Sequence, residues 1–182
     1  MYGERTLYRK VQVVLEYAKE EKHIDQESLC EYIESNKPTN FLCSWRDKET
    51  DIIEHRYSRN SIERAIKICV DLKLLQGEKM VLTSRGKSAT DPRRFPTITG
   101  SSAKEFLEAA GIPLNSILHA ISTILHSDKP YPPTSGEIWE RLGEAKGTIN
   151  QEEFQWLLTL LGQCQILSMS QRRIFLPWSG QR

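Results

Sequence analysis

Basic and amide side chains recur at helical spacing in the segment that begins at Arg59. Arg59, Asn60, Ser61, Arg64 and Lys67 share the outer side of a predicted helix, because residues three and four positions apart are neighbours on a helix surface. An arginine can pair with guanine and an asparagine with adenine through two hydrogen bonds. We therefore predict base-edge contacts for Arg59, Asn60 and Arg64, and a phosphate contact for Lys67. Ser61 belongs to the same predicted surface.

Positive charge is concentrated around this segment, although the whole chain is nearly neutral. The formal net charge is +1, yet residues 56–94 hold ten lysines and arginines against four acids, a local charge of +6. Salt screens charges beyond about 8–10 Å, so phosphates respond to local charge. Further phosphate contacts are predicted at Lys79, Arg85, Lys87, Arg93 and Arg94. The alternative is an ordinary solvated surface, where Ser58 or Ser61 caps the helix and Arg64 forms an ion pair.

The opposite side of the same predicted helix is apolar. Ile62, Ala65, Ile66, Cys69 and Leu72 have the spacing of one buried helical face. A short polar turn over 76–79 and an apolar run over 80–82 follow, which predicts a small β-hairpin. Thr83 is then placed to cap a further helical turn.

A helix that leads directly into a small hairpin resembles the recognition helix and wing of winged-helix proteins. The segment Leu82-Thr83-Ser84-Arg85-Gly86-Lys87 resembles the LT-x-x-G-K/R ending that is common among bacterial and archaeal winged-helix regulators. The resemblance implies that the helix enters a DNA major groove, while the wing touches the neighbouring backbone.

The order of predicted elements occurs twice along the chain. In the first half, helices are predicted over 4–22 and 25–35, before the helix and hairpin described above. In the second half, a short helix over 103–110 precedes helices that start near Leu114, Thr134 and Asn150, and a hairpin over 166–176. The predicted fold class is mainly α with small β-hairpins (α+β), arranged as two tandem winged-helix domains.

Two segments depart from this repeated order. Residues 36–57 form a connection far longer than the usual 2–8 residues between helices, with a helical turn predicted over 50–55. Residues 91–101 contain two prolines and a glycine, which favours a linker. The predicted domains are therefore 1–90, with the insertion 36–57, and 102–182.

The second half has a different predicted surface from the first. Its third helix begins Asn150-Gln151-Glu152-Glu153, and these acids would repel a phosphate backbone while favouring the helix dipole. We therefore predict a dimer or partner interface in this half, which includes Trp156, Arg172 and Arg173, together with Trp45 of the insertion. The alternative is that Trp156 is half buried under the N-terminal half of the chain.

Catalytic, cofactor and metal sites are not predicted. Glycine-rich phosphate loops are absent from the sequence. Cys30, Cys43, His55 and Cys69 lack the close pairs of a structural zinc site, and reduced thiols are expected. His119 and His126 are interpreted as ordinary helix residues. The chain has no apolar run long enough to span a membrane, so a cytoplasmic location is expected, or the nucleoid or nucleus if DNA is bound.

These observations predict a non-enzymatic protein that binds double-stranded DNA and regulates transcription. The first winged helix would contact DNA, and the second would mediate homodimerisation or bind a protein partner. The alternative is a non-catalytic tandem winged-helix scaffold subunit of a larger protein or nucleoprotein assembly, which the near-neutral total charge and the tryptophans favour.

Overall fold

The computed structural model describes residues 5–36, 42–46, 53–57, 59–127, 131–143, 147–170 and 173–175. The chain divides into two compact units, Met1–Phe95 (unit 1) and Pro96–Arg182 (unit 2). Both units are mainly helical with small antiparallel hairpins, which agrees with the predicted α+β fold class.

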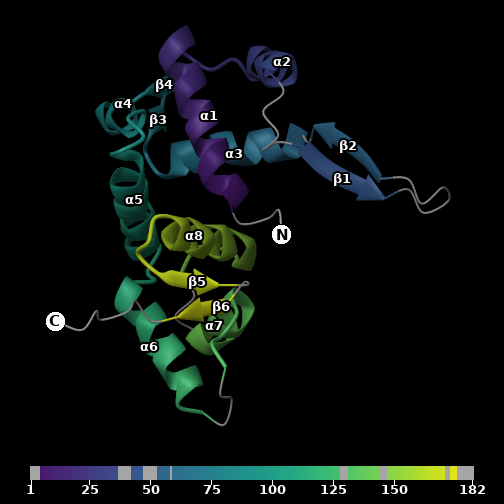
Figure 1. Ribbon diagram of the computed structural model, residues 1–182. Helices are drawn as coiled ribbons and strands as arrows, with labels where there is room; N and C mark the ends of the chain where they lie inside the picture. The colour runs from purple at the N-terminus through teal and green to yellow at the C-terminus, as the bar shows by residue number, and fades with distance from the viewer. Residues whose placement is uncertain are drawn as a thin grey trace. The chain divides into compact units, whose positions relative to one another are not determined.

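Unit 1 has the element order helix, helix, hairpin, helix, hairpin, helix (Figure 1). Its elements are α1 Arg5–Glu21, α2 Gln26–Asn36, β1 Leu42–Arg46, β2 Ile53–Tyr57, α3 Arg59–Asp71, β3 Leu75–Gln76, β4 Val81–Leu82 and α4 Ser84–Ala89. The helix bounds agree with the predicted ranges to within one or two residues.

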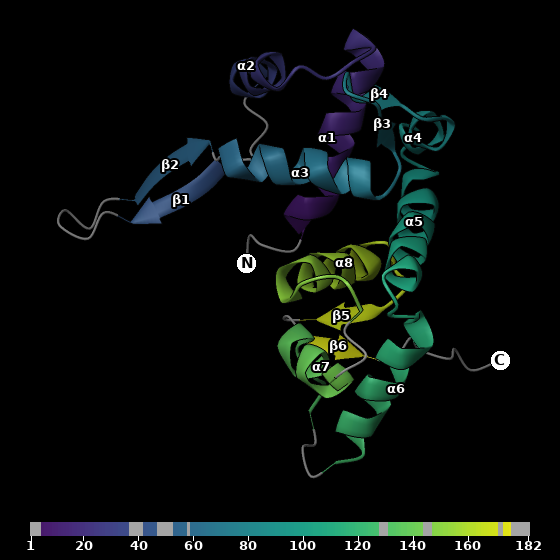
Figure 2. The same cartoon turned by 180° about the vertical axis from the view of Figure 1, so that it is seen from behind.

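The core of unit 1 lies where α1 crosses α3, a crossing that is visible from both sides (Figures 1 and 2). This is the most extensive helix–helix contact of the unit. On α3 the predicted apolar face is buried, and Ile68 is buried with it. On α1 the buried residues are Val11, Val14, Leu15, Tyr17 and Ala18. The period of apolar residues therefore determined correctly which side of α3 faces inward.

The residue types in the segment from Leu82 to Lys87 are explained by local contacts in unit 1. Leu75 and Gln76 pair with Leu82 and Val81. The Thr83 hydroxyl accepts a hydrogen bond from the Gly86 amide at 2.9 Å, which confirms the predicted cap. A Cβ atom at Gly86 would lie 2.0 Å from the Leu74 carbonyl oxygen. The glycine is therefore required by the close approach of α4 to the backbone before the hairpin.

The segment 36–57 differs from its prediction. Asn36 ends α2, and β1 pairs with β2 from Leu42↔Tyr57 to Arg46↔Ile53. The helical turn predicted over 50–55 is wrong for Ile53–His55, which are in β2; residues 50–52 lie outside the described residues. Figures 1 and 2 show this hairpin extending from the N-terminal end of α3.

The predicted linker 91–101 is mostly helical. The helix α5 spans Phe95–Ala109 and replaces the short helix predicted over 103–110. Pro96 is tolerated because it lies in the first turn, where a backbone N–H has no helical partner. Gly100 is buried, and a Cβ atom there would lie 2.5 Å from Ile166 Cδ1. The boundary between the units nevertheless falls inside the predicted range, at Phe95.

Unit 2 continues with helices and a hairpin in the predicted order. Its remaining elements are α6 Leu114–Leu125, α7 Ser135–Leu142, α8 Gln151–Gln163, β5 Ser168–Ser170 and β6 Arg173–Phe175. Capping boxes begin α7, between Thr134 and Glu137, and α8, between Asn150 and Glu153. Phe154 is fully buried, with its ring centroid 5.2 Å from that of Trp139.

Substituting Gly86→Ala should destabilise unit 1 by about 2 kcal/mol or more, because the added methyl group overlaps a backbone oxygen that cannot move away alone. The matched control is Gly136→Ala in α7, where the nearest atoms to a Cβ are 3.9 Å away. This control should be neutral or stabilise by up to about 1 kcal/mol. Chemical denaturation of the full chain measures both, and equal effects would contradict the close-approach explanation.

Candidate nucleic-acid interface

The outer face of α3 carries the polar residues that the sequence singled out. Arg59, Asn60, Glu63, Arg64 and Lys67 are all exposed, and they occupy the side of the helix opposite its buried face. The lysine forms an ion pair with Asp71 one turn away, at 2.7 Å. The surface therefore mixes basic, amide and acidic groups, with basic residues in the majority.

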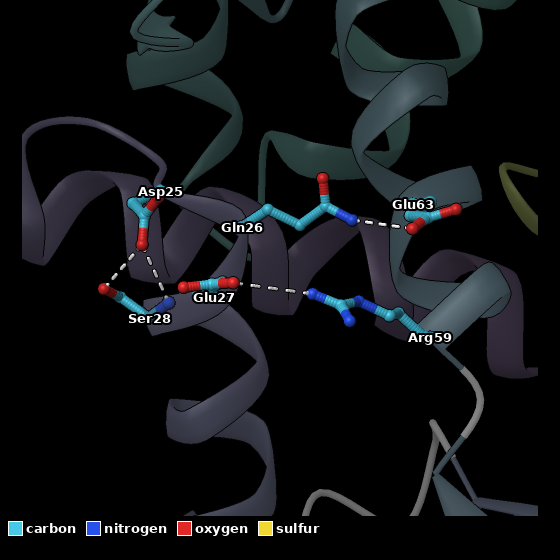
Figure 3. Close-up of polar contacts among 6 residues, drawn as sticks. All are labelled: Asp25, Gln26, Glu27, Ser28, Arg59 and Glu63. Carbon is cyan, nitrogen blue, oxygen red and sulfur yellow. Dashed lines mark hydrogen bonds and ion pairs between the residues drawn. The ribbon is translucent and has the colours of Figure 1, made fainter.

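Figure 3 shows how the start of α2 meets the start of α3. Gln26 Nε2 donates a hydrogen bond to Glu63 Oε1 at 2.7 Å. Arg59 and Glu27 form an ion pair at 4.0 Å, although 63% and 83% of their side-chain surfaces are exposed. Exposed pairs of this kind contribute about 0–1 kcal/mol. They orient Arg59 toward α2, whereas Asn60, Arg64 and Lys67 lie further from this contact along the helix surface.

The Ser61 side chain has a different environment from its neighbours. Lys10 Nζ of α1 donates a hydrogen bond to Ser61 Oγ, and the serine is half-buried. Its hydroxyl therefore links α3 to α1 instead of lying on the outer face. The prediction that Ser61 belongs to a DNA-binding surface does not fit this position.

The other predicted phosphate ligands do not all lie with α3. Lys79, Lys87, Arg93 and Arg94 are exposed, and Arg85 is half-buried. Lys87 lines a groove with Lys19 and Lys22 that contains no α3 residue among its described walls. The structure thus brings Arg59, Asn60, Arg64 and Lys67 together on one helix and places Lys87 on another surface.

The position of Trp156 does not fit the predicted partner interface. This side chain is 9% exposed, and its ring centroid lies 6.3 Å from that of Phe106 in α5. It belongs to the packed interior, so its predicted role as an exposed anchor is not supported. The side chains of Trp45, Arg172 and Arg173 lie outside the described residues.

The acids at the start of α8 have a structural role. Glu153 accepts a hydrogen bond from the Asn150 amide at 3.1 Å, and Asn150 accepts one from the Glu153 amide at 2.9 Å. The Glu153 carboxylate and the Asn150 side-chain oxygen therefore each satisfy one backbone N–H at the start of α8.

Two of the cysteines are kept as neutral thiols by burial. Cys69 and Cys164 are buried, and Cys30 is half-buried. Burial raises the pKa of the Cys69 thiol far above its ordinary value and that of Cys164 to about 12, which keeps both thiols neutral. Within the described ranges, no group of three or more His, Cys, Asp or Glu residues could hold a metal ion. None of the described helices is long and apolar enough to cross a membrane.

Comparison of the chain with protein-family models, curated proteins and solved structures found no match. The interpretation of the α3 surface therefore depends on its own geometry and charge.

Sequence reasoning assigned no role to four residues of unit 1 that meet distant parts of the chain: Gln26 and Glu27 contact α3, and Lys19 and Lys22 line a groove with Lys87. Gln26 and Glu27 lie in the helix predicted over 25–35, and Lys19 and Lys22 in the helix predicted over 4–22, and no role was predicted for any of them. Their roles depend on contacts with residues far along the chain, at Glu63, Arg59 and Lys87. The local signal in the sequence is Asp25, a residue type that often precedes a helix, and it lies directly before α2.

The cap of α2 should give a measurable pH dependence. The Ser28 amide donates to the Asp25 carboxylate at 3.0 Å and holds the pKa of Asp25 below its ordinary value of 3.8. A lowered folded-state pKa means that this stabilisation is complete above the ordinary pKa and is lost as the pH falls through the folded-state pKa. We expect the Ser28 amide resonance to titrate with a midpoint below 3.8, measured by NMR. Asp25→Asn, which keeps an acceptor, should abolish the titration, whereas a midpoint at or above the ordinary value would contradict the cap.

Proposed function

We propose that this protein binds double-stranded DNA through the outer face of α3 and acts as a transcriptional regulator. The observation that carries the proposal is the orientation of α3. Its apolar face packs on α1, and Asn60, Arg64 and Lys67 are exposed on the opposite side. The helix, helix, helix, hairpin order that both units contain, with an added hairpin in unit 1, supports two tandem winged-helix domains.

The dimensions of α3 are suitable for a DNA major groove. The helix has 13 residues, so it is about 20 Å long, and a major groove about 12 Å wide admits one helix. Arg64 would donate to guanine and Asn60 would pair with adenine, while Lys67 would exchange its ion pair with Asp71 for a phosphate. The β3–β4 hairpin directly follows α3, and Lys79 in its turn is exposed, which suits the role of a wing.

Unit 2 would then mediate dimerisation or bind a protein partner. The capped, acidic start of α8 disfavours phosphate contact, and many DNA-binding proteins of this kind are dimers on palindromic sites. The scaffold alternative loses the support that an exposed Trp156 would have provided, because that side chain is buried.

Removing two charges from α3 should weaken DNA binding. The variant Arg64→Gln/Lys67→Gln should bind random-sequence duplex DNA about tenfold more weakly, and the slope of log affinity against log salt should fall by about 1–2. Arg59 is left in place because its contact with Glu27 helps to hold α2. Fluorescence anisotropy at low and at physiological salt measures both quantities.

The matched control is Lys104→Gln/Arg141→Gln, which removes the same charge from exposed residues of unit 2. It should leave affinity within about twofold of wild type, because the proposal assigns no phosphate contact to these residues. If the wild type does not bind duplex DNA even at low salt, or if both variants weaken binding equally, α3 is not the DNA-binding surface.

A second substitution should strengthen binding. Glu63 is the acid on the outer face of α3, and it accepts the hydrogen bond from Gln26. Glu63→Gln keeps a side-chain oxygen for that bond and removes a negative charge, so DNA affinity should rise severalfold at low salt. Glu152→Gln at the exposed start of α8 is the control and should have no effect. A loss or no change of affinity with Glu63→Gln would argue against a phosphate backbone near α3.

A further inference from the structure

Unit 1 also contains a groove that is separate from the outer face of α3. A groove of about 770 Å³ lies between the end of α1, the β3–β4 hairpin and the end of α4. Lys19 and Lys22 line it from α1, Lys87 lines it from α4, and Val81 and Leu82 line it from the hairpin. These residues come from segments far apart in the sequence, so the groove exists only in the folded unit.

The charged side chains among the described residues that line the groove are all lysines. None of the described residues that line it is an acid. Lys19, Lys22 and Lys87 form no side-chain hydrogen bond or ion pair with the described part of the chain, although other lysines of unit 1, such as Lys67, do. Three like charges around one groove repel each other, and an anion bound among them would relieve that repulsion.

The backbone of Lys22 has an uncommon conformation. Lys22 follows the last residue of α1 with φ of 64°, a left-handed conformation that glycine and asparagine adopt more readily at a helix end. A lysine that holds this conformation brings a charge to the edge of the groove at a conformational cost.

The groove also has an apolar component. Ala18 is buried, while Val81 and Leu82 are half-buried beside the lysines. Its volume falls within the roughly 300–1,000 Å³ range of small-molecule sites, which combine apolar walls with a few polar groups. Inorganic phosphate alone would use the lysines but leave the apolar wall uncovered.

We propose that this groove binds a small organic anion, with an apolar body against Val81 and Leu82 and an acidic group among Lys19, Lys22 and Lys87. The proposal does not depend on DNA binding by α3. It also assigns Lys87 to a small-molecule site instead of to a DNA phosphate.

The test uses the full chain and the fluorescent aromatic sulfonate 8-anilinonaphthalene-1-sulfonate, with the uncharged N-phenyl-1-naphthylamine as its matched partner. Wild type should bind the sulfonate saturably, and the uncharged compound at least about tenfold more weakly. In Lys19→Gln/Lys22→Gln/Lys87→Gln the affinity for the sulfonate should fall about tenfold, because three charge contacts are lost together. Circular dichroism verifies that the variant is folded, and Lys22→Gln alone serves as a milder variant with a smaller loss.

The control is Lys73→Asn/Lys104→Gln/Arg141→Gln, which removes three cations that do not line this groove; asparagine suits the φ of 55° at Lys73. Its affinity for the sulfonate should match that of the wild type. Equal binding of the two compounds to wild type, unchanged sulfonate binding by the groove variant, or a loss in the control instead would overturn the proposal. Loss of duplex DNA binding by the groove variant, with sulfonate binding retained, would also overturn it and would assign the lysines to DNA phosphates.

Discussion

The packing of α3 on α1 determines most of what unit 1 can present to a partner. Each apolar side chain buried at such a contact contributes about 1.5–3 kcal/mol, whereas the exposed links from α2 to α3 contribute about 0–1 kcal/mol each. The apolar contact therefore sets the rotation of α3 about its axis. The ion pair at Arg59 and the hydrogen bond at Glu63 then adjust individual side chains. If α3 were rotated about its axis so that its outer face met α1, Asn60 and Arg64 would become buried even with the contacts to α2 intact.

Each unit has a helix directly before a small hairpin, and these two helices present different surfaces. In unit 1 the third helix, α3, begins with exposed Arg59 and Asn60. In unit 2 the corresponding helix, α8, begins with a capping box, and its Trp156 is buried against Phe106. A few residues at the start and on the outer side of the helix before each hairpin thus determine what that helix can bind. This difference is the physical basis for assigning DNA contact to one unit and assembly to the other.

Features that depend on a few neighbouring residues could be predicted from the sequence. The caps at Thr83, Thr134 and Asn150 require a side-chain oxygen and an amide within three residues, and the apolar face of α3 follows from its period. Features that depend on distant residues could not be predicted. Gly100 lies in α5 where Ile166 leaves no room for a Cβ atom, Trp156 packs against Phe106, and the three lysines of the groove meet only after α1 and α4 have packed. In the candidate site, the sequence identified the side chains on α3 but not the engagement of Ser61 by Lys10.

The most direct measurement is a map of backbone amide NMR shifts in the isotopically labelled full chain, recorded with and without a short random-sequence DNA duplex. The proposed function predicts that shift changes are concentrated over Arg59–Asp71 of α3 and the adjoining β3–β4 turn, and that Gln151–Gln163 of α8 is unaffected. Shift changes centred on α8, or none in α3 at saturating DNA, would contradict the central claim that the outer face of α3 is the DNA-binding surface.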